Sequence, residues 1–327
     1  MPLDTFLQVA DPVESLELYI VNVEAERHFS FGTWHNRQHV WLRVEAGGES
    51  GWGEQIASRN DPAVDPAGWQ PVLAELKGMP AGEALKHVRE RRGEWSRSAT
   101  EIAEMALLDV TGRVVGVPAI EELGLTGREP VPGLFCILED DPETAARQAR
   151  LSLEQNLRTH AKIKIFGETA KDTAVVAAVR DVMGPGAYLT ADANGGYGSP
   201  EPADLPELAE KLQALRAAGL DACEDPAHMP KESWVRLQEL LPDLALLPDE
   251  PCRPAWEAAE DLLPGMGRIY NMHPGCMGSV VDTVPLGRRI KREFGARLMV
   301  GDDSLVGPAC TAWQQLAIGL GADWVEA

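Results

Sequence analysis

The sequence predicts an α/β protein: a (β/α)8 TIM-type barrel preceded by an N-terminal α+β capping domain. Beyond about residue 130, short β-prone runs alternate with helical segments, as in a parallel sheet covered by helices. Three consecutive runs end in a carboxylate, at Asp192, Glu224 and Asp249. The intervals between them match the roughly 25–35 residues that one strand and one helix occupy in a barrel of ~250 residues. Each interval is therefore expected to hold one strand–helix unit.

Residues 1–130 are expected to form the capping domain, which begins with antiparallel strands. Apolar side chains alternate over 15–25 and 38–46, the pattern of strands with one buried face. Glycines within 47–48 and 51–54 predict the turns that follow these strands.

Helices are expected in the second half of the capping domain. Residues 68–95 have the pattern of interrupted helical segments, and 98–115 that of an amphipathic helix. Ser98 is the predicted N-cap of this helix, and Glu101 completes a capping box. A polar stretch with glycines then marks the boundary, so that residues 131–327 are expected to form the barrel.

Eight strands separated by helical patterns are expected in the barrel. They lie near 132–138, 160–166, 187–192, 220–224, 244–248, 268–273, 296–300 and 322–326. Parallel strands joined by crossover helices close into a barrel. The sequence stops just after the eighth strand, so the helix that normally covers that strand is missing from it.

Composition excludes several classes of partner. The chain has 327 residues and a formal net charge of −21, which argues against nucleic acid and anionic membrane as partners. No apolar run approaches the ~20 residues that cross a bilayer, and the N-terminus lacks a signal peptide pattern. Five scattered cysteines without C-x-x-C spacing predict reduced thiols in a cytoplasmic protein.

Lys162 and Lys164 lie two residues apart on one predicted strand, so both side chains point to the same face. A solvated face is the usual interpretation of such a pair. Helical segments before and after the strand instead favour a sheet covered on both sides. Two buried ammonium groups require anions nearby.

The three carboxylates at the strand ends supply those anions. Acidic residues at the carboxyl ends of barrel strands converge on one mouth, where barrel enzymes keep their active sites. Three converging carboxylates form a hard-oxygen site suited to Mg2+. Loop capping at the strand ends is the alternative, but it would not account for two buried lysines.

Several motifs in order carry a resemblance to a known family. They are 51–54, 103–112 with Pro118, Lys162-x-Lys164, Asp192-Ala193-Asn194, Glu224-Asp225-Pro226, Asp249-Glu250 and Gly301-x-x-Ser304. Together they resemble the enolase superfamily, in the mandelate racemase/muconate lactonizing enzyme group and nearest its muconate-lactonizing branch. The resemblance covers nearly the whole chain.

The resemblance implies a role for each charged residue. Asp192, Glu224 and Asp249 would ligate one Mg2+, with Mn2+ possible in its place. The substrate would be a small-molecule carboxylate, whose α-proton leaves to give a metal-stabilised enolate. Lys164 would be the base, and Lys162 its electrostatic partner beside the carboxylate.

Other implied positions surround this set. Asn194 and Glu250 would lie beside the metal ligands. Asp303 stands in strand seven where the family commonly has Glu. In strand eight, dipeptide epimerases of the family carry an Asp-x-Asp pair that holds an amino group, and this chain offers Glu326 there.

His273 is the main departure from the muconate-lactonizing pattern, which has a second lysine at this position of strand six. Imidazole titrates near neutral pH, so His273 is a candidate second acid/base. The alternative is a substrate-orienting residue that transfers no proton.

Two capping-domain loops are expected to close over the mouth and set specificity, 26–37 and 54–60. Trp34, with Phe29 and Phe31, makes the first loop aromatic, which suggests a substrate with an apolar portion. Packing of these rings inside the capping domain is the alternative.

The leading hypothesis is a racemase, epimerase or cycloisomerase. A one-base dehydratase or succinylbenzoate-synthase-like lyase is the first alternative, and a non-catalytic barrel that binds a carboxylate or a partner is the second. The family makes a homo-oligomer a further expectation.

Overall fold

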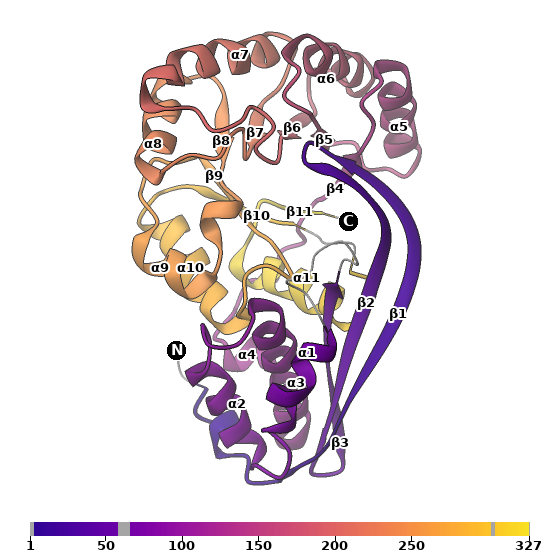
Figure 1. Ribbon diagram of the computed structural model, residues 1–327, viewed down its shortest axis with the longest axis vertical. Coiled ribbons are helices and arrows are strands. Elements are labelled where there is room, and N and C mark those ends of the chain that lie inside the picture. Colours follow the sequence, from indigo (N-terminus) through magenta and orange to yellow (C-terminus); the bar gives the residue numbers. More distant parts are fainter. Residues whose placement is uncertain (1–2, 58–65, 302–304, 327) are drawn as a thin grey trace.

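The computed structural model describes residues 3–57, 66–301 and 305–326. Eight parallel strands form the barrel, and a three-stranded antiparallel sheet with helices caps it (Figure 1). The barrel strands are Gly133–Ile137 (β4), His160–Lys164 (β5), Tyr188–Asp192 (β6), Ala222–Glu224 (β7), Ala245–Leu247 (β8), Ile269–Met272 (β9), Arg297–Val300 (β10) and Trp324–Glu326 (β11). Each coincides with a strand predicted from the sequence, so the predicted fold class is confirmed.

The strand order is β8-β7-β6-β5-β4-β11-β10-β9, and every neighbouring pair is parallel. Two backbone hydrogen bonds connect the remaining pair, β8 and β9. Arg268 donates its N–H to Leu246 at 3.1 Å, and Asn271 donates to Pro248 at 3.0 Å. The sheet is therefore a nearly closed ring.

Helices cover the outside of this ring. They are Pro142–Glu154 (α5), Thr169–Met183 (α6), Leu205–Ala217 (α7), Lys231–Leu240 (α8), Ala255–Asp261 (α9), Val280–Arg292 (α10) and Pro308–Leu320 (α11). Ile163 on β5 packs in the large apolar core together with residues of these helices. Inward side chains such as Leu134, Met299 and Trp324 form a separate apolar cluster in the ring's interior. Alternation along β5 therefore directs Lys162 and Lys164 inward.

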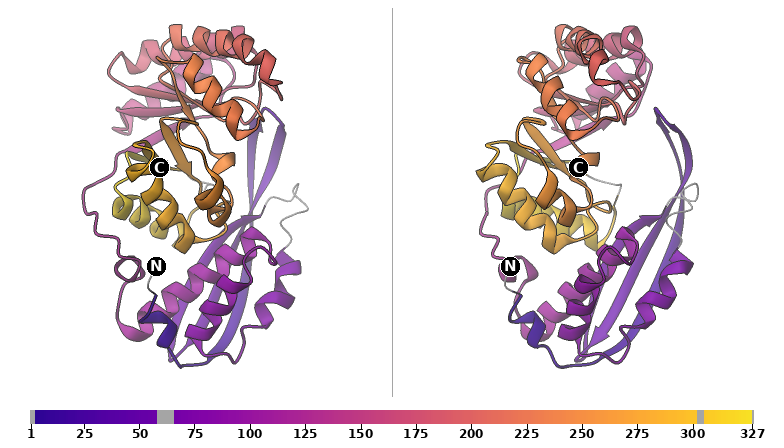
Figure 2. Two further views of the ribbon diagram at one scale, coloured as in Figure 1. Left: turned by 90° about the vertical axis from the view of Figure 1, so that its left-hand side faces the viewer. Right: turned by 60° about the vertical axis from the view of Figure 1, so that its left-hand side comes forward.

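The capping domain holds the elements that precede the barrel in the chain. They are Phe6–Gln8 (η1), Val13–Phe29 (β1), Gly32–Ala46 (β2), Glu49–Ala57 (β3), Pro66–Ala74 (α1), Ala81–Glu90 (α2), Arg97–Val115 (α3) and Ala119–Glu122 (α4). Strands β1 and β2 form one long hairpin that leaves the helices and reaches towards the barrel mouth (Figures 1 and 2). Within the described residues, no helix is long and apolar enough to span a membrane.

The expected loop 26–37 is wrong, because this segment forms the end of the hairpin. Pairing continues from Val13 opposite Ala46 to Phe29 opposite Gly32, with one irregularity directly after Val13 and another past Glu24. Of the expected loop 54–60, the first four residues belong to β3, and the rest lie outside the described residues.

Two local predictions in the capping domain are also wrong. Residues 51–54 form part of strand β3 rather than a turn. Helix α3 is capped by Ser96, whose side chain accepts the N–H of Ala99, and not by Ser98. Glu101 does not complete a capping box, because its carboxylate contacts the barrel instead.

Candidate active site

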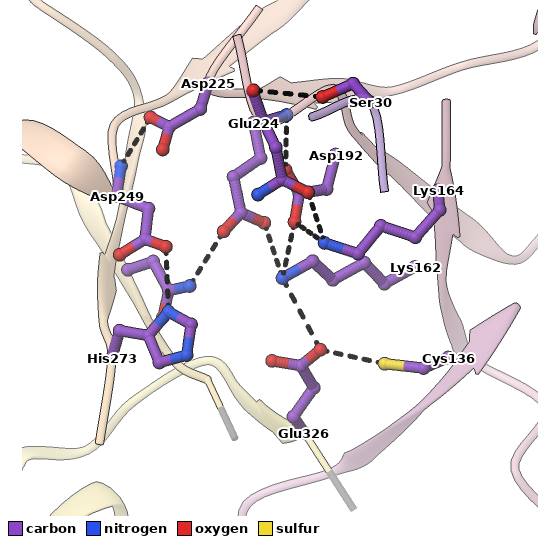
Figure 3. A network of polar contacts seen from close by, with 12 residues as sticks. Ser30, Cys136, Lys162, Lys164, Asp192, Glu224, Asp225, Asp249, His273 and Glu326 are labelled. Atoms are coloured by element: carbon purple, nitrogen blue, oxygen red, sulfur yellow. Dashed lines mark hydrogen bonds and ion pairs between the residues drawn. The ribbon is translucent and has the colours of Figure 1, made fainter. Parts of the chain in front are cut away.

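Lys164, Asp192 and Glu224 lie side by side at the carboxyl ends of three neighbouring strands. Lys164 on β5 is in register with Asp192 on β6, which is in register with Glu224 on β7. Asp249 comes two residues after the end of β8. The structure thus brings the predicted lysines and carboxylates to one mouth, together with His273 (Figure 3).

Lys162 is buried among three carboxylates. Its Nζ lies 2.9 Å from Glu224 Oε2, 3.4 Å from Asp192 Oδ2 and 3.4 Å from Glu326 Oε1. Burial lowers the pKa of Lys162, but the charges of these carboxylates, with Glu224 first, outweigh it and raise the pKa well above its usual value. The arrangement therefore favours the charged form of Lys162.

Lys164 reaches closer to the opening than Lys162. Its Nζ donates to Asp192 Oδ2 at 2.5 Å and to Asn194 Oδ1 at 2.7 Å. The backbone N–H of Asn194 donates to Asp192 Oδ1 at 3.0 Å. The Phe29 ring of the hairpin lies 5.1 Å from Lys164 Nζ.

Glu224 is completely buried at the centre of the network. Its Oε1 accepts a hydrogen bond from Asn271 Nδ2 at 2.8 Å. Burial raises the pKa of Glu224 well above its usual value, and the nearby charge of Asp192 raises it further. Burial and the neighbouring carboxylate therefore both disfavour the charged form of Glu224 in this arrangement.

Asp249 is held by two nitrogen-bearing side chains. Arg253 bonds both carboxylate oxygens, and His273 Nδ1 lies 2.8 Å from Oδ2. Burial raises the pKa of Asp249, but the charges of Arg253 and then His273 hold it well below its usual range.

Asp225 orders the turn that carries Asp249. Its two oxygens accept the backbone N–H groups of Asp249 and Glu250, both at 3.0 Å. Burial, and then the charge of Asp249, raises the pKa of Asp225 to about 7.

The donor chemistry of the three predicted ligands fits a divalent ion such as Mg2+. All of their donor atoms are oxygens, as hard cations prefer. In the described part of the network, carboxylates outnumber cations: Asp192, Glu224, Asp225, Asp249 and Glu326 against Lys162, Lys164 and Arg253.

The side-chain orientations add a condition to metal binding. In the described residues, no three His, Cys, Asp or Glu side chains converge closely enough to hold a metal. Asp192 and Glu224 turn to the lysines, and Asp249 turns to Arg253. These side chains have to turn towards one another before the three carboxylates can share one ion.

Three other predicted residues lie at different places. Glu250 is not brought into the network, since its side chain is 64% exposed and pairs with His228. Trp34 lies near the hairpin tip, with its ring centroid 4.7 Å from that of Phe29. Asp303 lies outside the described residues.

Four residues of the network were not predicted as site residues: Asn271, Arg253, Glu326 and Asp225. Arg253 had a local signal, because it follows Asp249 by four residues, a spacing at which side chains can pair. Asp225 stands inside a motif that was recognised without assigning it a role, and Asn271 lies two residues before His273. Glu326 was considered for an amino group, whereas its carboxylate faces Lys162 and accepts a hydrogen bond from Cys136 Sγ at 2.8 Å.

Comparison with known proteins agrees with this geometry. Residues 15–124 match the mandelate racemase/muconate lactonizing enzyme N-terminal domain, and residues 144–310 match the enolase C-terminal domain-like family. An N-succinylamino acid racemase of Thermus thermophilus is 30% identical over 81% of this chain and 72% of its own length. A hydrophobic dipeptide epimerase of Roseobacter litoralis is 25% identical over 83% and 77%.

The chain belongs to the mandelate racemase/muconate lactonizing enzyme group of the enolase superfamily. Its relatives are racemases, epimerases and cycloisomerases, and it is an isomerase of this group. A solved dipeptide epimerase of Cytophaga hutchinsonii, complexed with Mg and the dipeptide D-Ala-L-Val, has a similar fold. Its TM-score is 0.82 at 18% identity, over 96% of this chain and 86% of that one.

Proposed function

We propose that this protein racemises or epimerises a small carboxylate substrate, with Lys164 and His273 as the two groups that exchange its α-proton. One observation carries the proposal. Lys164 lies on β5 and His273 directly follows β9, and these strands are four apart in either direction around the eight-stranded ring. The two side chains therefore come from opposite walls of the barrel.

A substrate α-carbon between these walls would present one face to Lys164 and the other to His273. A proton removed on one face and delivered on the other inverts the carbon. Asp249 lies 2.8 Å from His273 Nδ1 and so orients the imidazole. The nitrogen that transfers the proton is then Nε2.

Asp192, Glu224 and Asp249 would hold Mg2+ beside the substrate carboxylate, and Mn2+ has the same ligand preference. When bound, the ion supplies positive charge that stabilises the negative charge developing on the substrate. Lys162 contributes a further fixed positive charge from the same side of the barrel.

The substrate class we propose is an N-acylated amino acid or a dipeptide with an apolar side chain. The named relatives support the acylamino acid carboxylate. The hairpin tip supports the apolar side chain, because Phe29, Phe31 and Trp34 cluster there and the Phe31 ring is 61% exposed.

Exchange of the α-proton with solvent deuterium tests the proposal. The wild-type protein with Mg2+ is incubated in D2O with both stereoisomers of N-succinyl amino acids and dipeptides, and mass gain is measured. Exchange of both stereoisomers is expected. Lys164→Ala should reduce exchange of one stereoisomer and His273→Asn that of the other, each by roughly 100–10,000-fold, as for a lost general acid or base.

Lys171→Ala is the matched control, because Lys171 pairs with Asp140 at the surface; its exchange should equal that of the wild type. Wild-type rates in Lys164→Ala would show the proposal to be wrong. If His273→Asn exchanges both stereoisomers at wild-type rates, His273 transfers no proton and only orients the substrate. A wild-type protein that exchanges one stereoisomer only would point to a one-base lyase instead.

A further inference from the structure

Arg253 follows the short 3-10 turn Glu250–Cys252 (η3) and reaches back to Asp249. Its Nε donates to Asp249 Oδ1 at 3.0 Å, and its Nη2 donates to Asp249 Oδ2. The Asp249 side chain is 2% exposed and that of Arg253 is 19% exposed. A buried, two-pronged pair between guanidinium and carboxylate is among the stronger polar contacts in proteins.

Both oxygens of Asp249 therefore already have nitrogen partners. Oδ2 also lies 2.8 Å from His273 Nδ1, and Arg253 Nη2 lies 3.4 Å from the same imidazole nitrogen. Each carboxylate oxygen has two lone-pair positions, so an ion can reach Oδ1 beside Arg253 Nε or replace a nitrogen at Oδ2, and at either oxygen it meets the positive charge of Arg253. The only donor on Oδ1 that the described contacts contain is Arg253 Nε.

Arg253 differs in kind from the lysines that face Asp192 and Glu224. A lysine ammonium meets a carboxylate as a compact point charge, whereas a guanidinium holds both carboxylate oxygens in a planar fork and keeps its charge at every physiological pH. Arg253 also lies only four residues from Asp249, so the pair forms within one local turn. The guanidinium is thus a permanent cation attached to one predicted metal ligand.

We propose that Arg253 competes with the divalent ion for Asp249 and thereby sets how tightly the site binds metal. The inference rests on the metal site of the proposed function. By thermodynamic linkage, a change that weakens the Arg253–Asp249 pair raises metal affinity, and bound metal weakens the pair by the same factor.

Calorimetric measurement of MgCl2 binding to the EDTA-treated full-length chain tests this competition. Arg253→Gln keeps an amide donor without the charge, and should bind Mg2+ at least roughly tenfold more tightly than wild type, within the usual range of coupling between sites. Arg253→Lys keeps the charge without the two-pronged geometry, and its affinity should fall between the two.

Thermal unfolding provides a second readout. Without Mg2+, Arg253→Gln should melt at a lower temperature than wild type, because Asp249 loses a buried partner. Saturating MgCl2 should raise the Tm of Arg253→Gln by more than it raises that of the wild type. If Arg253→Gln does not fold, Arg253→Lys decides the outcome.

Arg236→Gln is the control, since Arg236 is exposed on α8 and pairs with Glu239; its Mg2+ affinity should equal that of wild type. Equal or weaker Mg2+ binding by folded Arg253→Gln would overturn the inference and leave the metal site intact. Wild-type Mg2+ binding that Asp249→Asn abolishes would support that site. An absence of Mg2+ binding in wild type and all variants would reject the metal site itself.

Discussion

Glu101 on α3 is completely buried, and its two oxygens accept the backbone N–H groups of Gly275 and Gly278, both at 2.7 Å. Both glycines belong to the turn that directly follows His273. Burial raises the pKa of Glu101 to about 7, although the two N–H donors lower it. A carboxylate of the capping domain thus orders the backbone next to a proposed acid/base group.

The pKa of Glu101 predicts a pH dependence of stability. Its ordinary pKa is 4.5, so between pH 4.5 and about 7 the folded state binds more protons than the unfolded state. The free energy of unfolding therefore falls as pH rises through this window. Glu101→Gln has no carboxyl group to titrate at this position. As pH rises from 4.5 to about 7, its free energy of unfolding should therefore increase relative to that of the wild type by up to roughly 3 kcal/mol. Urea unfolding at several pH values measures the change.

Glu94→Gln is the matched control, because Glu94 is 61% exposed and pairs with Arg91. Its stability difference from wild type should stay constant over the same pH range. A constant difference for Glu101→Gln would contradict the prediction.

Site residues that belong to sequence motifs could be predicted, and residues defined by distant contacts could not. Asp192 and Glu224 each end a short apolar run, and Lys162 lies within another. Barrel geometry brings the ends of neighbouring strands together, so the contact between these side chains could be expected. Glu101 has the same Ser-x-x-Glu spacing as a local capping box. Its partners are 174 and 177 residues away, and no local pattern distinguishes the two roles.

Strand β3 and helix α3 approach each other so closely that β3 needs glycines. A Cβ at Gly51 would lie 2.3 Å from the Ala106 carbonyl oxygen, and one at Gly53 would lie 2.2 Å from that of Ile102. The two glycines suggested a turn in the sequence. They instead permit backbone contact between a strand and a helix, a second common use of glycine in strands.

Gly53→Ala should therefore destabilise the protein. The added methyl group meets helix backbone, which cannot rotate away, and overpacking of this kind costs roughly 1–3 kcal/mol. The free energy of unfolding in urea measures the loss. Gly186→Ala is the control, because a Cβ there meets nothing within 4 Å. Equal stability of the two variants would show that β3 can move away from α3.

The hairpin is the element that the sequence predicted least well. Its outer part has no single buried face: Tyr19, Ile20, Val21 and Val23 are 40–47% exposed although they follow one another closely. Beyond this part, residues 26–37 are mostly polar and include Gly32, so the segment resembled a loop. The barrel strands are short and buried, so their apolar runs were recognisable.

At the scale of the whole molecule, the described residues include three buried glutamates that join the capping domain to the barrel. Glu54 accepts the N–H groups of Val306, Gly307 and Ala309 at the start of α11. Glu104 accepts hydrogen bonds from Ser279 and Val281 at the start of α10, and Glu101 bonds the turn before it. Negative charge at helix N-termini is favourable, so both domains gain from the contact.

Glu54→Gln should loosen this contact at α11. An amide has one acceptor oxygen, so at least one of the three N–H groups loses its partner. Hydrogen–deuterium exchange should become faster in the first turn of α11 and in β3, and remain unchanged in α5 and α6. Glu168→Gln is the control, since Glu168 precedes α6 without a side-chain cap bond. Unchanged exchange at α11 would contradict the prediction.

The same glutamates bear on how the chain is made. A ribosome synthesises the capping domain before the barrel, yet the partners of Glu54 follow it by 252 to 255 residues. While most of the barrel is still untranslated, these carboxylates have only water and nascent chain as neighbours. Domains generally fold as units during synthesis. Here the capping domain, which is made before the barrel, reaches its docked form only when α11 has left the ribosome.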